Sequence, residues 1–129
     1  MECAATEGGQ ASRELALAAL FQAIVQIESG GNLKARNGDA YGPAQIKPVV
    51  VEDLKRAGYD VSLRERGTMD GSFRLFKLYT QHWIQRRKLK DSARTRANIW
   101  RYGPFNAKTT HNDATYYSKQ AEFLMSRKK

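Results

Sequence analysis

The chain has 129 residues, 41% of them hydrophobic, with 22 Lys and Arg against 13 Asp and Glu, for a net charge of +9. This length suits one domain with a single core and excludes two. A lone cysteine, Cys3, excludes a disulfide framework and a cysteine-based metal site. No segment approaches the roughly 18 apolar residues of a membrane span, so we expect a soluble chain whose export signal is absent or already removed. The positive charge favours a polyanionic partner, such as a cell-wall polymer, an anionic lipid or nucleic acid.

Helical periodicity runs through most of the chain and predicts a mainly α, compact single domain of about five helices with long functional loops. We expect a flexible N-terminal segment over residues 1–11 and the domain over residues 12–129. The predicted helices cover residues 12–28, 44–57, 68–88, 91–100 and 112–124. Ser12 is the expected cap of the first helix, Thr68 or Asp70 of the third, and Asp91 or Ser92 of the fourth. Pro48 should strain or restart the second helix, although the β-branched run at residues 49–51 could also be extended.

Glu28 is the most informative residue of the chain. The apolar stripe of the first helix, Leu17, Phe21 and Ile24, continues with Glu28 at helical spacing, and two glycines follow at once. A carboxyl group that is partly buried, and that lies at the negative end of a helix, is expected to have a raised pKa, which suits a general acid. The alternative is that the stripe ends at Ile24 and that Glu28 points into water beside a glycine cap.

Three motifs then follow in order. Residues 28–32 (Glu-Ser-Gly-Gly-Asn) and 41–48 (Tyr-Gly-Pro-Ala-Gln-Ile-Lys-Pro) resemble two successive motifs of the lysozyme-like lytic transglycosylase (SLT domain) family, a Glu-Ser pair and Gly-x-x-Gln-(Ile/Leu)-x-Pro. Residues 99–103 (Ile-Trp-Arg-Tyr-Gly) are similar to a degenerate form of its Ala-Tyr-Asn-x-Gly motif, with Arg101 in place of asparagine. Residues 115–117 (Thr-Tyr-Tyr) lie where the family has an active-site tyrosine. Order and spacing agree over residues 20–124.

The resemblance implies a lysozyme-like fold, related to goose-type lysozyme, and cleavage of the β-1,4 bond between N-acetylmuramic acid and N-acetylglucosamine in peptidoglycan. Glu28 would protonate the leaving oxygen and then accept the proton of the sugar 6-hydroxyl as a 1,6-anhydro ring closes, so that one carboxylate suffices. The expected substrate-binding residues are Ser29, Gly42, Gln45, Ile46, Trp100, Tyr102 and Tyr117. No metal and no cofactor are expected.

Structural roles are the alternative for several of these residues. Ser29 could only end the helix, Gln45 could be an ordinary polar residue of a first helical turn, and Tyr117 could be a core aromatic with a wet hydroxyl. Asp39 is the one nearby candidate for a second carboxylate, and a muramidase that activates water would need it. Its neighbours, Asn37 and Gly38, are also ordinary turn composition.

Other functions are weighed against these. One alternative is a module that binds glycan but no longer cleaves it. Arg101, in place of the family's asparagine, would then indicate the loss of catalysis. The sequence disfavours nucleic acid as a partner because the aromatic residues have helical core spacing rather than the arrangement of a stacking platform. His82 and His111 are isolated, and His82 is expected to be a half-buried helix residue. The expected partners are peptidoglycan strands and secretion-system or phage structures, at a periplasmic, wall-associated, secreted or phage-delivered location.

Overall fold

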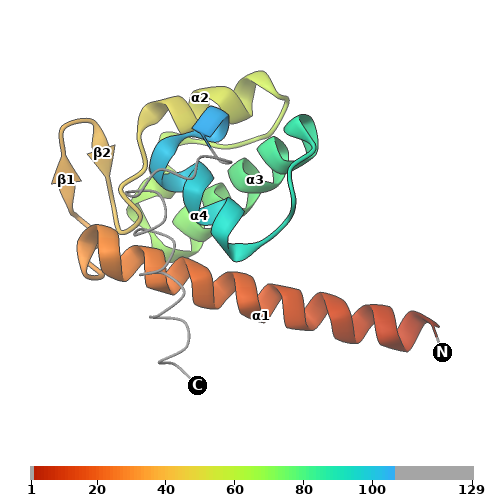
Figure 1. Ribbon diagram of the computed structural model, residues 1–129. Coiled ribbons are helices and arrows are strands. Elements are labelled where there is room, and N and C mark those ends of the chain that lie inside the picture. Colours follow the sequence, from red (N-terminus) through yellow and green to blue (C-terminus); the bar gives the residue numbers. More distant parts are fainter. Residues whose placement is uncertain (1, 107–129) are drawn as a thin grey trace.

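The computed structural model describes residues 2–106, and the side chains of residues 13–105. This part of the chain is mainly α, as predicted (Figure 1). It contains α1 (Glu2–Ser29), α2 (Pro48–Arg56), α3 (Met69–Arg87) and α4 (Ala93–Tyr102), an antiparallel pair β1 (Arg36–Asn37) and β2 (Ala40–Tyr41), and the 3₁₀ turns η1 (Leu63–Gly67) and η2 (Pro104–Asn106). The fifth predicted helix, residues 112–124, lies outside the described residues.

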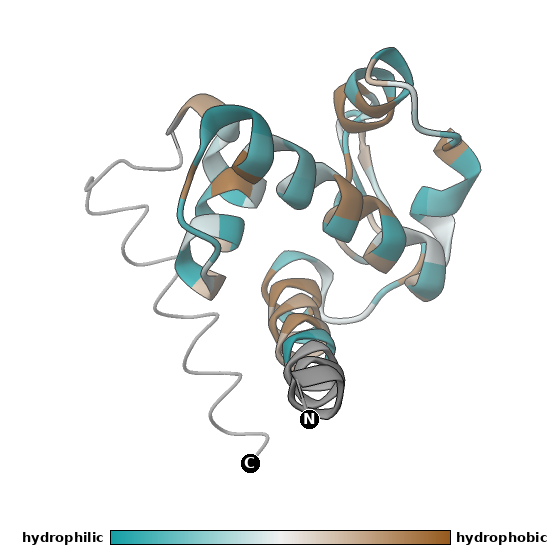
Figure 2. Ribbon diagram, turned by 90° about the vertical axis from the view of Figure 1, so that its right-hand side faces the viewer, coloured by the Kyte–Doolittle hydropathy of each residue, from teal (hydrophilic) through white to brown (hydrophobic). Residues whose placement is uncertain are grey.

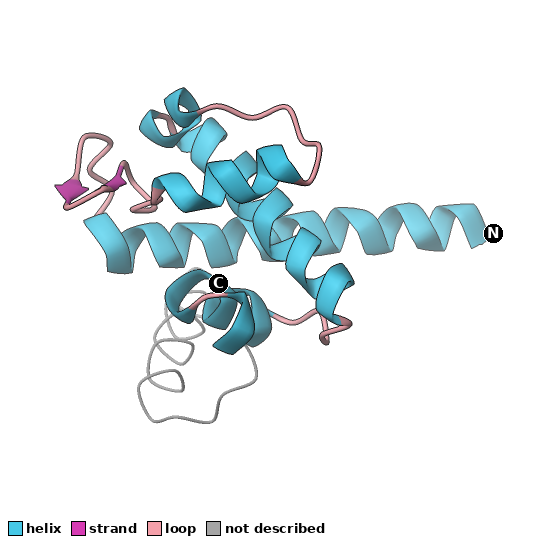
Figure 3. Ribbon diagram, turned by 90° about the horizontal axis from the view of Figure 1, so that it is seen from above, coloured by secondary structure: helices cyan, strands magenta, loops and turns pink. Residues whose placement is uncertain are grey.

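Helix α1 runs along one side of the domain, and its N-terminal part projects beyond the other described elements (Figures 1 and 3). It begins at Glu2, so the predicted start at Ser12 is wrong, and residues 2–11 belong to the helix. These residues contain no proline and are mostly good helix formers. The pair Gly8-Gly9 costs about 1 kcal/mol per residue in a helix interior, which does not end it here.

One apolar core joins the four described helices (Figure 2). Phe21 of α1 lies at its centre, with ring centroids 5.0 Å from Phe73 and 5.6 Å from Phe76 of α3. The fully buried side chains around this contact include Leu20, Ile24, Ile46, Val51, Leu54, Leu75 and Ile99. Helices α1 and α4 both pack on α3 and on each other.

Two predictions for residues 30–57 are corrected. Helix α2 begins at Pro48, not at Ala44, because proline suits the first helical position and forces the preceding Lys47 into extended backbone (φ −84°, ψ 153°). The run at residues 49–51 is helical, so the extended alternative is wrong. The predicted loop contains the β1–β2 hairpin, which was missed because each strand has only two residues.

The predicted N-terminal caps of α3 and α4 are confirmed, although α4 continues two residues beyond its predicted end at Trp100. Thr68 caps α3, and its hydroxyl accepts a hydrogen bond from the Gly71 N–H at 2.9 Å. Ser92 caps α4 in the same way, accepting from the Thr95 N–H at 3.1 Å. Helix α4 stops at Gly103, whose φ of 92° suits glycine.

Candidate functional site

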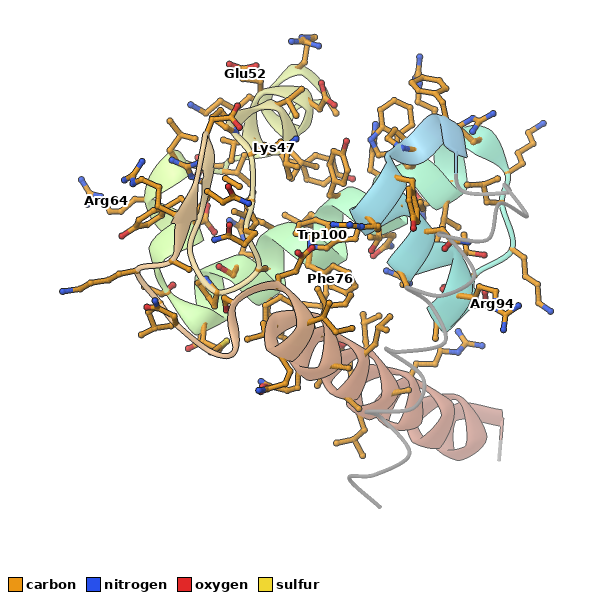
Figure 4. The ribbon with its side chains drawn as sticks, turned by 60° about the vertical axis from the view of Figure 1, so that its left-hand side comes forward. Lys47, Glu52, Arg64, Phe76, Arg94 and Trp100 are labelled. Carbon is orange, nitrogen blue, oxygen red and sulfur yellow. The ribbon has the colours of Figure 1, made fainter. Side chains whose placement is uncertain are left out.

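Most of the predicted site residues that the structure describes line one pocket. Its volume is about 610 Å³, within the range of roughly 300–1,000 Å³ that ligand sites occupy. One wall is the β1–β2 hairpin with the segment that leads into α2, and the other is the end of α4. Figure 4 shows Lys47 and Trp100 on these two walls. The lining residues are Glu28, Asn37, Asp39, Ala40, Gln45, Ile46, Lys47, Val49, Val50, Tyr79, Ile99, Trp100, Arg101, Tyr102 and Gly103.

Glu28 lies in the last turn of α1, where that helix meets the pocket. Its side chain is half-buried, and it lines the pocket together with Gln45 of the second motif and with Trp100 and Tyr102 of the third. The preceding stripe residues Phe21 and Ile24 are buried in the core. Glu28 therefore lies on the same helix face as the buried stripe, as the sequence predicts, and this face meets the pocket at the end of α1.

Ser29 connects the end of α1 to the second motif. Its Oγ lies 2.7 Å from the carbonyl oxygen of Pro43 and 3.2 Å from that of Val25, and it accepts a hydrogen bond from the Gly31 N–H at 3.1 Å. Ser29 is not among the lining residues of the pocket. In the described structure its hydrogen bonds join the end of α1, next to Glu28, to the Pro43 segment.

Gln45 holds the second motif in a turn. Its Nε2 donates to the carbonyl oxygens of Ala35 and Gly42, both at 3.0 Å, and its backbone has a positive φ of 53°. Both acceptors are carbonyls, so they also fix which end of the amide is nitrogen. With the two amide hydrogens used in this way, Oε1 is the atom of Gln45 that can accept a hydrogen bond from a ligand.

The structure gives a reason for glycine at position 42 that the sequence did not reveal. We expected this glycine to let the backbone approach a glycan, but Gly42 is buried and does not line the pocket. Its φ is 88°, and a Cβ built on it would overlap the carbonyl oxygen of Arg66. The close approach at Gly42 in the described structure is therefore to the η1 turn, and its expected approach to a glycan stays a prediction.

Arg66 was missed by the sequence analysis. Its Nη1 donates to the carbonyl oxygens of Asp39 and Ile46, both at 3.0 Å, and its guanidinium carbon lies 5.5 Å from the centre of the Tyr41 ring. One side chain from η1 thus holds both the hairpin and the second motif. Arginines are frequent in this chain, and no local pattern distinguishes Arg66 from the others.

The wall formed by α4 is fixed through Trp100. Its Nε1 donates to the carbonyl oxygen of Ala44 at 3.3 Å, and its ring makes edge contacts with Phe76 at 5.1 Å and Tyr79 at 6.1 Å between centroids. Tyr102 is half-buried, and the exposed Arg101 has its guanidinium 5.9 Å from the Tyr102 ring. Trp100 therefore presents a ring to the pocket while its N–H joins the two walls.

Tyr79 of α3 adds a buried tyrosine to the lining of the pocket. Its Oη donates to Asp53 at 3.4 Å. Burial, followed by the Asp53 carboxylate, raises the pKa of Tyr79 to about 12. The phenol therefore remains neutral at every physiological pH and lines the pocket as an uncharged group.

The remaining predicted residues have three different outcomes. Asp39 is exposed and lines the same pocket as Glu28, so the candidate second carboxylate is on the same side of the domain. Ile46 reaches the pocket but is 1% exposed and belongs to the core. Tyr117 and His111 lie outside the described residues.

Other features of the described chain are separate from this pocket. His82 is half-buried, as predicted, and its ring contacts Tyr59 and Trp83. Within residues 2–106, no group of three or more His, Cys, Asp or Glu side chains is placed to hold a metal ion. A second hollow of about 1,080 Å³ lies between α1, α3 and the start of α4, and contains none of the predicted site residues.

The helices of the described part include none that is both long and apolar enough to cross a bilayer. Comparison with protein-family models, with curated proteins and with solved structures finds no match to this chain.

Proposed function

We propose that this protein is a peptidoglycan lytic transglycosylase that cleaves the β-1,4 bond between N-acetylmuramic acid and N-acetylglucosamine. The observation that carries the proposal is the meeting of Glu28 and Gln45, from separate sequence motifs, in one pocket of ligand-site size. The third motif supports it by supplying the opposite wall. Ser29 supports it further, because its hydrogen bonding joins the end of α1 to the second motif.

The reaction needs one carboxyl group that changes its protonation state. Protonated Glu28 gives its proton to the glycosidic oxygen as the bond from that oxygen to C1 of the muramic acid breaks. The substrate N-acetyl group stabilises the developing positive charge. The 6-hydroxyl oxygen then forms a bond to C1, and its proton passes to the ionised Glu28, which restores the acid for the next turnover.

The other pocket residues have supporting roles in this scheme. Oε1 of Gln45 is available to accept a hydrogen bond from a sugar hydroxyl or amide, since Nε2 is used by two backbone carbonyls. Tyr79 contributes a neutral surface, and the ring of Trp100 offers an apolar face to a sugar. The net charge of +9 suits an anionic cell wall at a periplasmic, secreted or phage-delivered location.

The direct test is the Glu28→Gln variant. Purified peptidoglycan is incubated with the wild-type protein and with each variant, and soluble fragments are identified by mass spectrometry. Glu52→Gln is the matched control, because Glu52 is an exposed glutamate on α2 that does not line the pocket (Figure 4). We expect 1,6-anhydromuramyl ends from the wild type and from Glu52→Gln, and at least a 100-fold loss in Glu28→Gln. Undiminished turnover in Glu28→Gln would contradict the mechanism.

Muramidase activity is the second candidate function, and the observation that favours it is Asp39 in the same pocket as Glu28. A hydrolase would use Asp39 as the base that activates water. Ordinary reducing ends, together with loss of activity in Asp39→Asn, would select this function. Sacculi that are retained but never solubilised would instead indicate a glycan-binding module.

A further inference from the structure

A row of aromatic rings leads from the pocket to the surface of the domain. Trp100 and Tyr79 line the pocket, with ring centroids 6.1 Å apart. Tyr79 lies 6.4 Å from Trp83, and Trp83 lies 5.4 Å from Phe105. The last ring, Phe105 of η2, is 71% exposed. The middle rings of this series belong to the core or pack against it, and the exposed end lies two residues after Gly103 of the pocket wall.

Phe105 is held in place although it is exposed. Arg87, in the last turn of α3, donates from Nη1 to the carbonyl oxygen of Pro104 at 2.6 Å. The guanidinium carbon of Arg87 also lies 5.1 Å from the centre of the Phe105 ring. One arginine thus fixes both the η2 backbone and the ring that η2 carries. A phenylalanine that was merely exposed on a loop would not need these two contacts with Arg87.

The chemistry of this surface suits a sugar ring. Aromatic rings pack against the apolar C–H face of a pyranose, and a ring that is already fixed loses little entropy on binding. The other N–H groups of the Arg87 guanidinium stand beside such a face as donors for hydroxyl, amide or carboxylate oxygens. A flat apolar ring beside a donor matches the mixed surface of an N-acetylated sugar.

We propose that Trp83, Phe105 and Arg87 form an outer glycan subsite, which binds a sugar of the same peptidoglycan strand beyond the pocket. This inference rests on the proposed function, since the occupant is the strand that Glu28 cleaves. The position of Phe105 sets the occupant: it lies two residues after Gly103, which lines the pocket, so a strand that leaves the pocket at this end meets the exposed ring.

The test measures affinity as a function of glycan length. Alternating N-acetylmuramic acid–N-acetylglucosamine oligosaccharides of two, four, six and eight sugars are titrated by calorimetry against Glu28→Gln protein, which should not turn them over. Phe105→Ala is added to this background, and Phe105→Trp tests rescue by another aromatic ring. Leu15→Ala is the matched control, because Leu15 is an equally exposed apolar residue (73%) that lines neither hollow.

We expect Phe105→Ala to weaken binding of the long oligosaccharides by about three- to tenfold, the range for loss of one aromatic contact. The loss should grow with glycan length, and Phe105→Trp should restore the affinity. The subsite is ruled out if Phe105→Ala and Leu15→Ala give the same affinities at every length. Absence of oligosaccharide binding by the Glu28→Gln parent, together with no cleavage by the wild type, would instead refute the proposed function itself.

Discussion

Replacement of Gly42 by alanine should distort the turn that carries Gln45. The backbone of Gly42 has φ 88°, and a Cβ there would overlap the carbonyl oxygen of Arg66. Gly42 also accepts a hydrogen bond from Gln45 Nε2 at 3.0 Å, and its own N–H donates to Ala35 at 2.8 Å. The overlap is with backbone and not with a flexible side chain, so the turn itself must move.

Two costs add in this variant. A left-handed backbone costs an alanine about 1–2 kcal/mol relative to glycine, partly offset by a gain of about 0.4–1 kcal/mol through the unfolded state. Forcing a methyl group into filled space adds about 1–3 kcal/mol. We therefore expect Gly42→Ala to lower the free energy of unfolding by about 1–5 kcal/mol, a large part of the roughly 5–15 kcal/mol typical of a domain.

Gly31→Ala separates the two costs. Gly31 has almost the same φ, 92°, but a Cβ there meets nothing within 4 Å. Urea denaturation followed by circular dichroism should move the midpoint by about 1 M more for Gly42→Ala than for Gly31→Ala, with unchanged slope. The folded Gly42→Ala protein should also lose glycan cleavage. Equal midpoints for the two variants would refute the argument that packing against η1 requires glycine at position 42.

Three further predictions follow from single side chains. Arg66→Gln should reduce cleavage mainly through a higher KM, because it removes the guanidinium that joins the two pocket segments. Arg66→Lys should restore activity only in part. Steady-state kinetics on soluble glycans measure both effects. The raised pKa of Tyr79 means that its stabilising effect is complete below about pH 10 and is lost as pH rises toward about 12. Comparing alkaline unfolding of the wild type with that of Tyr79→Phe measures it, and equal profiles would contradict it. Hydrogen bonding from Arg96 lowers the pKa of Asp91. The stability advantage of the wild type over Asp91→Asn should therefore be present at neutral pH and shrink as pH falls below about 4. Acid denaturation curves of the two proteins that stay equally separated at every pH would contradict this prediction.

Local sequence patterns predicted much of the helical part. The caps Thr68 and Ser92 were recognisable because a hydroxyl before an apolar-periodic segment satisfies the free N–H groups of a first helical turn. Periodicity also predicted that Glu28 would lie on the buried side of α1, because residues three and four apart share a helix face. The start of α1 was misjudged, since a plausible cap at Ser12 does not prevent a helix from starting earlier.

The sequence by itself thus determined that the four described helices exist, the caps of α3 and α4, and the helix face of Glu28, since these depend on residues within one or two turns. Only the tertiary structure decided how the pocket is built. Arg66 bonds to carbonyls 20 and 27 residues away, Trp100 to one 56 residues away, and Gly42 is confined by η1. These contacts depend on backbone atoms, which every residue carries. A sequence therefore does not mark the partners, and their pairing appears only when the packed core brings the segments together.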